Sequence, residues 1–430
     1  MTAIEKIYKL FIEHPIISTD SRKIENNCIF FALKGENFNG NKFAFTALEQ
    51  GAVCAIIDEP GYSVSDKTIL VDNVLQTLKD LANFHRRKLG LPILAITGTN
   101  GKTTTKELVS AVLSEKFNVS FTQGNLNNHI GVPLTLLKMN SDTEFGVVEM
   151  GANHPGEIAD LCAIAEPDYG IITNIGKAHL EGFGSFEGVI KTKSELYQFI
   201  KSNNGIIFYN RENPLLTQLS NDIEHRISFG FDDADFKGEL LSSPPFVHVK
   251  AYFKKGVLYL NTNLTGEYNF ENILAAACIG NYFDVDPVKI QKALKNYYPQ
   301  NNRSQLINKN GLKIIMDAYN ANPTSMQASI KSFMSNNSGK SYLILGDMLE
   351  LGKYSRTEHT SILELLKSYP ETTVYTVGKN FFEIAGKFNC KSFQNVDLLC
   401  NFLADNPITE GAVLIKGSRG IQLEKVLNCL

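Results

Sequence analysis

The stretch Ile93-Leu94-Ala95-Ile96-Thr97-Gly98-Thr99-Asn100-Gly101-Lys102-Thr103-Thr104 decides the fold of this chain. Its first four residues are apolar and predict a buried strand, and residues 106–113 after it have the apolar spacing of a helix. Glycines in a turn allow successive backbone N–H groups to point at one anion, and the N-terminus of the following helix adds positive charge. We therefore expect Gly98 to Thr104 to bind the phosphates of a nucleotide.

Two side chains of this turn have predictable roles. Lys102 would reach the β- and γ-phosphates, and the Thr103 hydroxyl would hold Mg²⁺. One position departs from the usual pattern, which has a glycine where this chain has Ile96. The alternative interpretation is an ordinary strand-to-helix turn that binds nothing. The strand before the turn and the helix after it favour the phosphate site.

The composition is that of a globular chain with several domains. Its 430 residues leave room for roughly three domains, and 43% hydrophobic with 20% charged residues can build large cores. A net charge of −3 argues against nucleic acid or an anionic membrane as the main partner. No apolar run approaches the roughly 18 residues of a membrane span. Residues 1–14 predict an amphipathic helix rather than a signal peptide, and we expect a monomer.

The cysteines predict a reducing location. None of them forms a Cys-x-x-Cys pair, so the sequence predicts neither a disulfide framework nor a zinc site. Free thiols fit the cytoplasm, where we expect the protein to act. The seven cysteines are Cys28, Cys54, Cys162, Cys278, Cys390, Cys400 and Cys429.

The order of strand and helix patterns predicts three α/β domains. We place a small α/β domain at residues 1–90 and a central phosphate-turn domain with a doubly wound parallel sheet at 91–300. A Rossmann-like α/β domain follows at 301–430. The basic segment 85–92, which ends in Gly-Leu-Pro, and the segment 297–302 are the boundary candidates.

The polar ends of the predicted central strands suggest where a ligand lies. Because ligands gather at the carboxyl ends of parallel strands, we expect Thr97, Glu149, Asn174 and Asn210 to lie near one another. Outside the central sheet, 246–260 predicts antiparallel strands. Further strands are predicted at 28–33, 53–57, 145–149, 170–174, 205–210, 313–317, 341–347, 372–377 and 412–417, and helices at 43–51 and 271–283.

Three single residues have both an ordinary and a functional interpretation. Glu149 ends the strand after the phosphate turn, where an acid can complete the Mg²⁺ shell. His179 follows the next strand end, but a single histidine is more often structural. Lys193 lies on a predicted helix and would ordinarily be a solvated cation.

An ordered set of motifs resembles the Mur ligases, the ATP-dependent amide ligases that build the peptide of bacterial peptidoglycan. That family also lacks the first glycine of the usual turn. The resemblance spans nearly the whole chain. The motifs are Thr97–Thr103, Glu149–Ile158, Thr173–Leu180, Asn269–Ala276, Asp317–Pro323, Gly346–Gly352 and Lys416–Arg419.

The resemblance implies roles for individual residues. It assigns one Mg²⁺ to Thr103 and Glu149, and a second Mg²⁺ to His179 and Lys193, with Lys193 carrying a carbamate. The implied catalytic residues are Lys102, Glu149, His179 and Lys193. The implied ATP site adds Asn269, Asn272, Arg303 and Asp317 to the turn, and the implied substrate site comprises Asp20, Ser21, Arg22, Asn128, Lys416 and Ser418.

Two motifs resemble the branch of the family that adds a dipeptide. These are Asn320-Ala321-Asn322-Pro323 and Gly346–Gly352, whereas the Asp-Asn-Pro-Arg motif of the branch that adds the third amino acid is absent. The implied substrates are UDP-N-acetylmuramoyl-tripeptide and D-alanyl-D-alanine, joined through an acyl phosphate. In the implied UDP-sugar domain, Asn39-Gly40-Asn41 stands where Asp-Gly-His is common.

Other functions remain open at this point. The chain could add meso-diaminopimelate or lysine, or could extend folate with glutamate, although a separate domain at 1–90 argues against the folate reaction. A protein that binds nucleotide without catalysis is a different class, and Lys102, Glu149, His179 and Lys193 argue against it. The third residue of the tripeptide, meso-diaminopimelate or L-lysine, is left undetermined.

Overall fold

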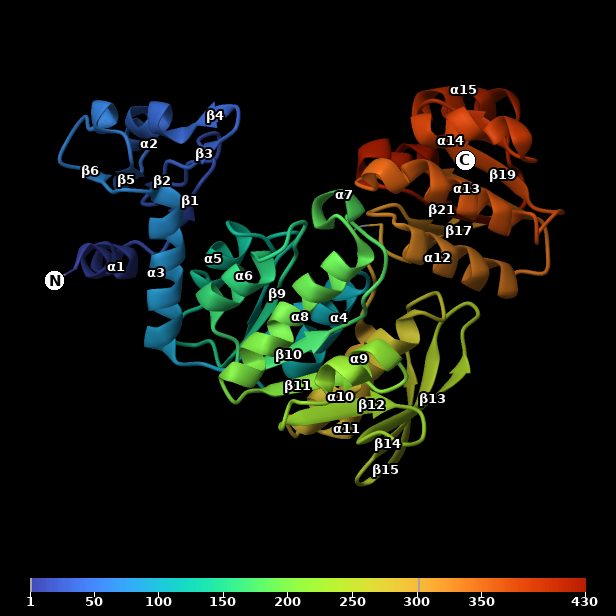
Figure 1. Cartoon of the computed structure of the whole chain (residues 1–430), viewed down its shortest axis with the longest axis horizontal. Helices are drawn as coiled ribbons and strands as arrows, with labels where there is room; N and C mark the ends of the chain where they lie inside the picture. Colours follow the sequence, from blue (N-terminus) through green and yellow to red (C-terminus); the bar gives the residue numbers. More distant parts are fainter. Residues whose placement is uncertain (1, 301) are drawn as a thin grey trace.

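The chain folds into three α/β domains, with the first and third on opposite sides of the second (Figure 1). The structure is a computed structural model that describes residues 2–300 and 302–430. Met1 and Asn301 lie outside the described residues. The helix predicted over 1–14 and the domain predicted over 301–430 therefore each begin with a residue outside the described part of the chain.

The first domain is built on a four-stranded parallel sheet with the strand order β1-β2-β5-β6. Small side chains such as Ala44 and Ala55 are buried between one face of the sheet and α2. The predicted strands at 28–33 and 53–57 and the predicted helix at 43–51 are present. The elements are α1 (Ala3–Glu13), β1 (Ile17–Ser18), β2 (Ile29–Phe31), β3 (Lys34–Gly35), β4 (Phe38–Asn39), η1 (Gly40–Phe43), α2 (Ala44–Glu49), β5 (Cys54–Ile57), η2 (Pro60–Tyr62), β6 (Thr68–Leu70) and α3 (Val74–Leu89).

Helix α3 connects the first domain to the second. Its amphipathic pattern buries Leu78 and Leu81, and its last turns bond to the central domain. His85 Nε2 lies 2.8 Å from the Met139 carbonyl oxygen, and Arg86 Nε donates to the Ala165 carbonyl at 3.0 Å. The segment 85–92 thus contains the end of this helix, which Gly90 terminates in a left-handed conformation.

The central domain contains a nine-stranded sheet in the order β15-β14-β13-β12-β11-β10-β7-β9-β8. Neighbouring strands from β8 to β13 are parallel, and β13, β14 and β15 are antiparallel, as predicted for 246–260. The elements are β7 (Ile93–Thr97), α4 (Lys102–Leu113), β8 (Val119–Phe121), α5 (Gly131–Leu136), β9 (Phe145–Glu149), α6 (Glu157–Ala165), β10 (Tyr169–Ile172), α7 (Leu180–Phe183), α8 (Phe186–Ser202), β11 (Ile206–Asn210), α9 (Pro214–Ser220), β12 (Arg226–Gly230), β13 (Phe236–Ser242), β14 (His248–Phe253), β15 (Gly256–Asn261), α10 (Asn269–Tyr282) and α11 (Pro287–Asn296).

Helices cover both faces of this sheet, as expected for a doubly wound fold. Successive residues of β7 point to opposite faces, so Ala95 packs into one core with α3, α5, α6 and α8. Ile96 packs into the other core with α4, α10 and α11. This burial on both faces explains why β7 is apolar throughout, and it fixes the position of the turn that follows the strand.

The C-terminal domain has a six-stranded sheet in the order β16-β17-β21-β18-β19-β20, in which only the β16–β17 pair is antiparallel. The four strands predicted after residue 312 are present. The elements are β16 (Gln305–Lys309), β17 (Leu312–Asp317), α12 (Pro323–Ser335), β18 (Ser341–Gly346), η3 (Gly352–Tyr354), α13 (Ser355–Leu366), β19 (Thr373–Val377), α14 (Lys379–Ile384), η4 (Ala385–Lys387), β20 (Lys391–Phe393), α15 (Val396–Asp405), β21 (Gly411–Lys416), η5 (Arg419–Ile421) and η6 (Leu423–Cys429).

One disulfide corrects the expectation that every cysteine is free. Cys400 on α15 and Cys429 at the end of η6 are bonded, with their Cα atoms 5.6 Å apart. Spacing in the sequence could not reveal this pair, because the packing of α15 against η6 brings the two residues together. The other five cysteines are free, and four of them are buried.

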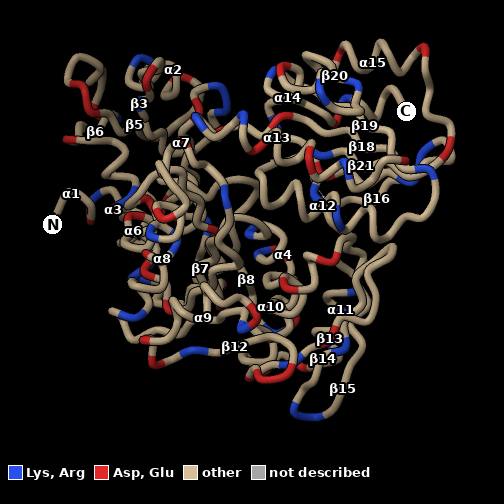
Figure 2. The backbone as a smooth tube through the Cα atoms, turned by 45° about the vertical axis from the view of Figure 1, so that its right-hand side comes forward, with Lys and Arg blue, Asp and Glu red and all other residues tan. Residues whose placement is uncertain are grey.

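The placement of charged residues along the chain agrees with the small net charge. Figure 2 shows acidic and basic residues distributed over all three domains rather than segregated by sign. No helix in the described part of the chain has the length and apolar character that crossing a bilayer requires.

Candidate functional site

The phosphate turn follows β7 at the centre of the nine-stranded sheet. Gly98 has φ +142°, and a Cβ atom there would lie 2.0 Å from Oγ1 of Thr173. Gly101 has φ +79° and caps α4, and a Cβ atom there would lie 2.6 Å from Oδ1 of Asn272. Side chains other than hydrogen are therefore excluded at both positions, which explains the glycines of the motif.

Asn174, at the end of the neighbouring strand β10, holds this turn. Its Oδ1 accepts from the Asn100 backbone N–H at 3.0 Å, and its Nδ2 donates to the Asn100 carbonyl at 3.0 Å. The Thr173 hydroxyl donates to the same carbonyl at 2.6 Å. The predicted clustering of polar strand ends is thus present at Thr97, Asn174 and Glu149, because Ile172 pairs with Thr97 and Ile96 pairs with Glu149.

Lys102 lies over the turn. Its Nζ donates to the carbonyls of Gly98 and Thr99, at 2.8 and 3.1 Å. Burial lowers the pKa of Lys102, the charge of Glu149 opposes this effect, and the charge of Arg303 adds to it. Thr103 is buried at the first turn of α4, beside Lys102.

Glu149 has one bonded and one unbonded carboxylate oxygen. Its Oε1 accepts from Asn127 Nδ2 at 2.7 Å. Its Oε2 is buried without a hydrogen-bond partner among the described residues, and the side chain is only 1% exposed. A buried carboxylate oxygen without a partner is costly, so this atom is suited to bind a cation.

His179 likewise has a buried atom, the ring nitrogen Nδ1, without a hydrogen-bond partner among the described residues. It lies between β10 and α7 with φ +49°. Its Nδ1 lies against Oε2 of Glu350 from the C-terminal domain. This nitrogen is nevertheless buried without a partner at hydrogen-bonding geometry in the described part of the chain.

Lys193 is buried on α8, only 2% exposed. Burial lowers its pKa to about 7, and the nearby charge of Lys102 adds to the effect, while Glu157 and Glu195 oppose it. Its Nζ lies 5.6 Å from the centre of the Phe183 ring. An amine in this environment is substantially neutral near pH 7.5, unlike an exposed lysine.

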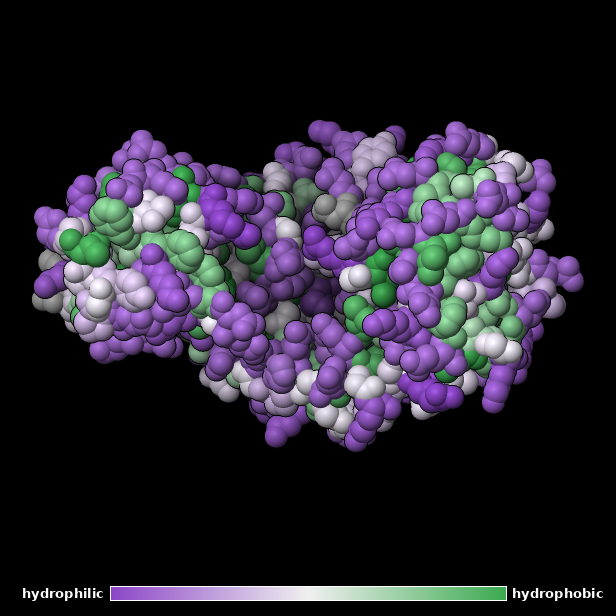
Figure 3. Space-filling model, turned by 90° about the horizontal axis from the view of Figure 1, so that it is seen from above, coloured by the Kyte–Doolittle hydropathy of each residue, from purple (hydrophilic) through white to green (hydrophobic). Residues whose placement is uncertain are grey.

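Lys102, Thr103, Glu149 and His179 line a cleft of about 920 Å³ to which all three domains contribute. Figure 3 shows a hollow of hydrophilic residues between the first and third domains. Some of the predicted residues do not line the cleft, namely Gly98, Lys193, Asp20, Ser21, Arg22 and Ser418. Those that do are Thr99, Asn100, Gly101, Lys102, Thr103, Thr104, Asn128, Glu149, His179, Asn269, Asn272, Arg303, Asp317 and Lys416.

The two asparagines at the start of α10 bond mainly within the protein. Asn272 Oδ1 accepts from the Thr105 hydroxyl at 3.0 Å, and its Nδ2 donates to Asn269 Oδ1 at 2.8 Å. Asn269 Nδ2 donates to the Thr265 carbonyl at 2.7 Å. Asn272 therefore fastens α10 to the helix of the phosphate turn, and Asn269 supports Asn272 at the wall of the cleft.

The C-terminal domain presents several charged side chains to the cleft. Arg303 stacks on Tyr319, with its guanidinium carbon 3.6 Å from the ring centre. Asp317 accepts from Lys416 Nζ at 2.5 Å, and register places these two residues side by side at the ends of β17 and β21. Ser418 instead accepts from the Leu349 backbone N–H at 3.0 Å, and so supports the loop after β18.

Asp20 and Arg22 form an exposed pair in the first domain. Arg22 Nε donates to Asp20 Oδ1 at 2.9 Å, and this hydrogen bond lowers the pKa of Asp20 to about 2. The pair lies at the end of β1, away from the cleft lining. The structure therefore does not bring Asp20, Ser21 and Arg22 together with the phosphate turn.

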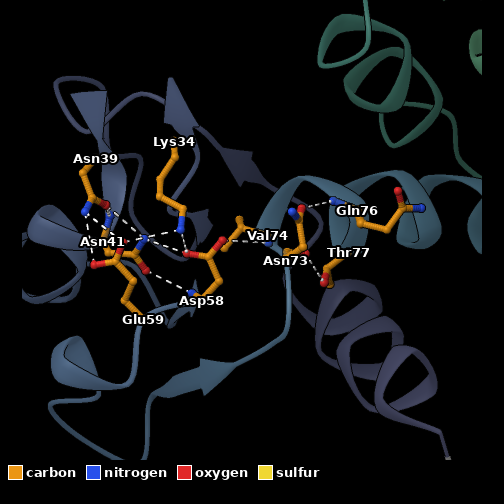
Figure 4. A network of polar contacts seen from close by, with 9 residues as sticks. All are labelled: Lys34, Asn39, Asn41, Asp58, Glu59, Asn73, Val74, Gln76 and Thr77. Carbon is orange, nitrogen blue, oxygen red and sulfur yellow. Dashed lines mark hydrogen bonds and ion pairs between the residues drawn. The ribbon is translucent and has the colours of Figure 1, made fainter. Parts of the chain in front are cut away.

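The unusual Asn39-Gly40-Asn41 sequence belongs to a polar network that Figure 4 shows. The buried Asn41 donates to Asp58 Oδ1 at 2.9 Å and accepts from the Asp58 backbone N–H at 3.0 Å. Asp58 Oδ2 in turn accepts from the Val74 backbone N–H at the start of α3, at 3.3 Å. Lys34 pairs with Asp58 at 3.0 Å. Asn41 thus links the β3–β4 hairpin to α3.

Two cation positions fit this chemistry. The unbonded Oε2 of Glu149 and the nearby Thr103 hydroxyl are oxygen ligands of the kind Mg²⁺ prefers, and Nδ1 of His179 is a second candidate ligand. Among the described residues, no group of three or more His, Cys, Asp or Glu side chains could hold a metal alone. Bound cations would therefore also need ligands from the nucleotide, water or a modified Lys193.

Sequence reasoning missed three residues at this site. Asn127 orients Glu149, Glu350 contacts His179, and Asn322 donates from the C-terminal domain to Asn100 Oδ1 at 2.7 Å. Glu350 and Asn322 lie in the motifs Gly346–Gly352 and Asp317–Pro323, which by themselves indicate no role for either residue. Their contacts depend on how the domains pack, so only the motif membership was visible in the sequence.

The fold and the cleft together indicate the class of protein to which the chain belongs. A phosphate turn at the carboxyl edge of a doubly wound sheet, enclosed by two further domains, is the arrangement of a multidomain nucleotide-dependent enzyme. Three family descriptions match successive parts of the chain. The Mur ligase family catalytic domain matches residues 14–86, the Mur ligase middle domain matches 96–280, and the Mur ligase glutamate ligase domain matches 302–419.

Individual relatives extend over almost the whole chain. The UDP-N-acetylmuramoyl-tripeptide–D-alanyl-D-alanine ligase of Bacillus subtilis is 35% identical over 96% of this chain and 92% of its own length. A crystal structure of MurF from Acinetobacter baumannii superposes with a TM-score of 0.87 at 30% identity, covering 96% of this chain and 92% of the other. The MurF ligase of Thermotoga maritima in complex with ADP has a TM-score of 0.86 at 28% identity, covering 100% and 98%. The chain belongs to the Mur ligase family.

Proposed function

We propose that this protein is an ATP-dependent ligase that joins D-alanyl-D-alanine to UDP-N-acetylmuramoyl-tripeptide for peptidoglycan precursor synthesis. The observation that carries the proposal is the shared cleft. The phosphate turn, Glu149 and His179 of the central domain line it together with Arg303 and Lys416 of the C-terminal domain. The B. subtilis relative, named for this reaction, supports the choice of substrates, and the ADP complex of the T. maritima relative supports ATP as the nucleotide.

The phosphate turn would hold the nucleotide. Its backbone N–H groups and the start of α4 would face the phosphates, and Lys102, which bonds to the turn carbonyls, would bring its charge to the β- and γ-phosphates. Thr103 and Glu149 would hold one Mg²⁺. The ATP site would be completed from the cleft wall by Asn269, Asn272, Arg303 and Asp317.

Lys193 would carry a carbamate. The neutral amine, available because burial lowers the pKa of Lys193 to about 7, attacks the carbon of CO₂. An N–C bond forms, one C=O π bond becomes a C–O⁻, and the amine proton is released to solvent. The product is an anion with two oxygens, which together with His179 would hold a second Mg²⁺.

The reaction then needs two steps. The terminal carboxylate of the tripeptide attacks the γ-phosphorus of ATP, giving an acyl phosphate and ADP. The free amine of D-alanyl-D-alanine attacks the acyl carbon, the C–N bond forms, and inorganic phosphate and a proton leave. The chain contributes by positioning the three substrates and by closing the cleft against water, which would otherwise hydrolyse the acyl phosphate.

Charge neutralisation is the central task of the site. A carboxylate brought to 4 Å from a phosphate oxygen costs about 4 kcal/mol per charge pair at an effective dielectric constant of 20. Lys102 and Arg303 place two positive charges in the cleft to offset this repulsion. When bound, Mg²⁺ supplies further positive charge to the reacting phosphate.

The substrate ends would reach different domains. Asp20, Ser21 and Arg22 of the first domain would bind the UDP part, and Asn128, which lines the cleft, would contact the sugar-peptide. Lys416 would meet the incoming dipeptide, with Ser418 supporting it through the loop after β18. The enzyme would work as a cytoplasmic monomer.

One assay tests the whole proposal. ADP release is measured with ATP, Mg²⁺ and UDP-N-acetylmuramoyl-tripeptide, and D-alanyl-D-alanine, meso-diaminopimelate, L-lysine and L-glutamate are offered in turn. We expect ADP release only with D-alanyl-D-alanine and only when the tripeptide is present. In a parallel assay, a UDP-dipeptide replaces the tripeptide. ADP release with meso-diaminopimelate or L-lysine in that assay would assign the chain to the branch of the family that adds the third amino acid. No release with any acceptor would exclude catalysis and leave nucleotide binding alone. Comparing tripeptides that end in meso-diaminopimelate and in L-lysine identifies the natural one.

A further inference from the structure

Two loops from different domains meet at His179. His179 itself belongs to the central domain, in the loop between β10 and α7, and Glu350 belongs to the loop between β18 and η3 of the C-terminal domain. Both residues adopt left-handed backbone conformations, with φ +49° and φ +63°. Such conformations are unfavourable in residues other than glycine. The surrounding structure therefore holds both side chains in place.

Contacts around Glu350 fix its position against the central domain. Its carbonyl oxygen accepts from the Glu181 backbone N–H at 3.3 Å. Gly352, with φ +51°, packs so closely that a Cβ atom there would lie 3.2 Å from Cβ of Glu181. The Tyr354 hydroxyl donates to the Gly184 carbonyl at 3.4 Å. Docking of this loop delivers the Glu350 carboxylate to the His179 ring.

The two side chains meet at the interface between the central and C-terminal domains. Oε2 of Glu350 lies directly against Nδ1 of His179, yet that nitrogen has no aligned hydrogen bond among the described residues. Both residues line the cleft that Glu149 also lines. Carboxylate oxygen and imidazole nitrogen are both common ligands of divalent cations.

We propose that Glu350 is a ligand of the cation held by His179, supplied by the C-terminal domain. This inference rests on the proposed function, which assigns a second divalent cation to His179. It has a consequence for the order of events, because the cation gains its full ligand set only when the C-terminal domain is docked. Cation binding and domain docking would then favour each other, by the reciprocity of linked equilibria.

The test measures cation binding rather than turnover. Mn²⁺ is titrated into the full-length protein with a non-hydrolysable ATP analogue, and free Mn²⁺ is followed by electron paramagnetic resonance. We expect Glu350→Gln, which keeps the size of the side chain and removes its charge, to weaken one Mn²⁺ site at least tenfold. Glu350→Asp retains a carboxylate and should give an intermediate loss. Thermal unfolding of each variant checks that it remains folded.

Glu181→Gln is the matched control. Glu181 is exposed and lies on the same interface, and its backbone N–H donates to the Glu350 carbonyl. The substitution removes the same charge and should leave Mn²⁺ affinity within twofold of the unmodified protein. Equal losses in the two variants would show a general charge effect and overturn the proposal, as would unchanged binding in Glu350→Gln.

His179→Ala separates this inference from the proposed function. If His179→Ala loses one Mn²⁺ site and Glu350→Gln does not, the metal assignment stands and the role of Glu350 is wrong. If His179→Ala binds both ions normally, the second metal site of the proposed function is itself wrong. A positive result has a second readout, because Mn²⁺ with the nucleotide analogue should compact the protein in small-angle scattering less in Glu350→Gln than in Glu181→Gln.

Discussion

At the scale of single residues, the site depends on buried polar groups that the described residues leave unsatisfied. Glu149 and His179 each keep one buried polar atom without a partner among the described residues, and Lys193 is a buried amine whose pKa burial lowers to about 7. Each arrangement is unfavourable in the protein alone. The unfavourable groups are the ones that the proposed cations and carbamate would satisfy.

Gly98 is predicted to tolerate no side chain. In Gly98→Ala the new Cβ would lie 2.0 Å from Oγ1 of Thr173, at φ +142°. We expect the turn to distort, with a loss of roughly 1–3 kcal/mol in stability and of nucleotide affinity by at least tenfold, measured by calorimetric titration of ADP. Gly35→Ala is the control, because nothing lies within 4 Å of a Cβ there. Normal ADP affinity in Gly98→Ala would contradict the assigned role of the turn.

Lys193→Ala tests the carbamate. Without the amine no carbamate forms, so ligase turnover should fall on the order of 100-fold or more, and a short carboxylate such as acetate should restore part of it. Lys191→Ala, exposed on the same helix, should behave as the unmodified enzyme with or without acetate. Turnover is followed as ADP release. An unimpaired Lys193→Ala enzyme would remove the carbamate from the mechanism.

At the scale of elements, the strands at the site were predictable and α3 was not predicted. The apolar runs of β7, β9, β10 and β11 are short and end in polar residues, so pattern and topology together located the site. The apolar spacing of α3 at Val74, Leu78, Leu81 and Ala82 is helical and could have revealed the helix. Strands β12 and β13 were not assigned, since they are partly exposed and carry charged residues.

Helix α3 should respond to pH through His85. Burial lowers the pKa of His85, whereas in the unfolded chain the pKa is near 6.5. The unfolded state therefore binds more protons below pH 6.5. The contribution of neutral, buried His85 to the stability of the helix is fully present above pH 6.5. It falls as the pH drops toward the pKa that His85 has in the folded protein, by at most about 1.4 kcal/mol per pH unit.

Hydrogen–deuterium exchange of peptides covering residues 74–89, between pH 5 and 7.5, measures this dependence. After correction for the intrinsic exchange rate, protection should decline with acid in the unmodified protein. It should decline less in His85→Gln, which keeps a donor toward the Met139 carbonyl. His225→Gln, at an exposed position, serves as the control. The same acid dependence in His85→Gln would assign the effect to another group.

At the scale of the whole molecule, function depends on how the C-terminal domain meets the central domain. Asn322 bonds to Asn100 of the phosphate turn, Glu358 pairs with Lys177 at 2.8 Å, and Glu350 meets His179. Partners so far apart in the sequence could not be paired from sequence patterns. The same is true of the disulfide between Cys400 and Cys429, since only the packed fold brings its two elements together.

Substitutions at the interface between the central and C-terminal domains should separate the two domains and then restore their packing. A Cβ atom on Gly176 would lie 2.8 Å from Oγ1 of Thr324 across the two domains. Gly176→Val should therefore push the C-terminal domain away, raising the radius of gyration in small-angle scattering and lowering turnover at least tenfold. Gly176→Ala should do so more weakly, and Gly176→Ala combined with Thr324→Ala should recover. Failure of the second substitution to rescue would show that the defect lies within the central domain.

The outermost strand of the central sheet has a consequence for solubility. Among the described residues, β15 pairs with no second strand on its outer side, where Gln291 of α11 donates to the Tyr259 carbonyl at 2.8 Å, and it exposes Val257 and Tyr259. Such an edge is a template on which a strand of another molecule can add. Lys254 and Lys255 occupy the hairpin tip next to it, and Figure 2 shows this positive charge at the end of the β14–β15 ribbon. Charged side chains beside an edge oppose the addition of another strand, so this positive charge guards the ribbon against aggregation.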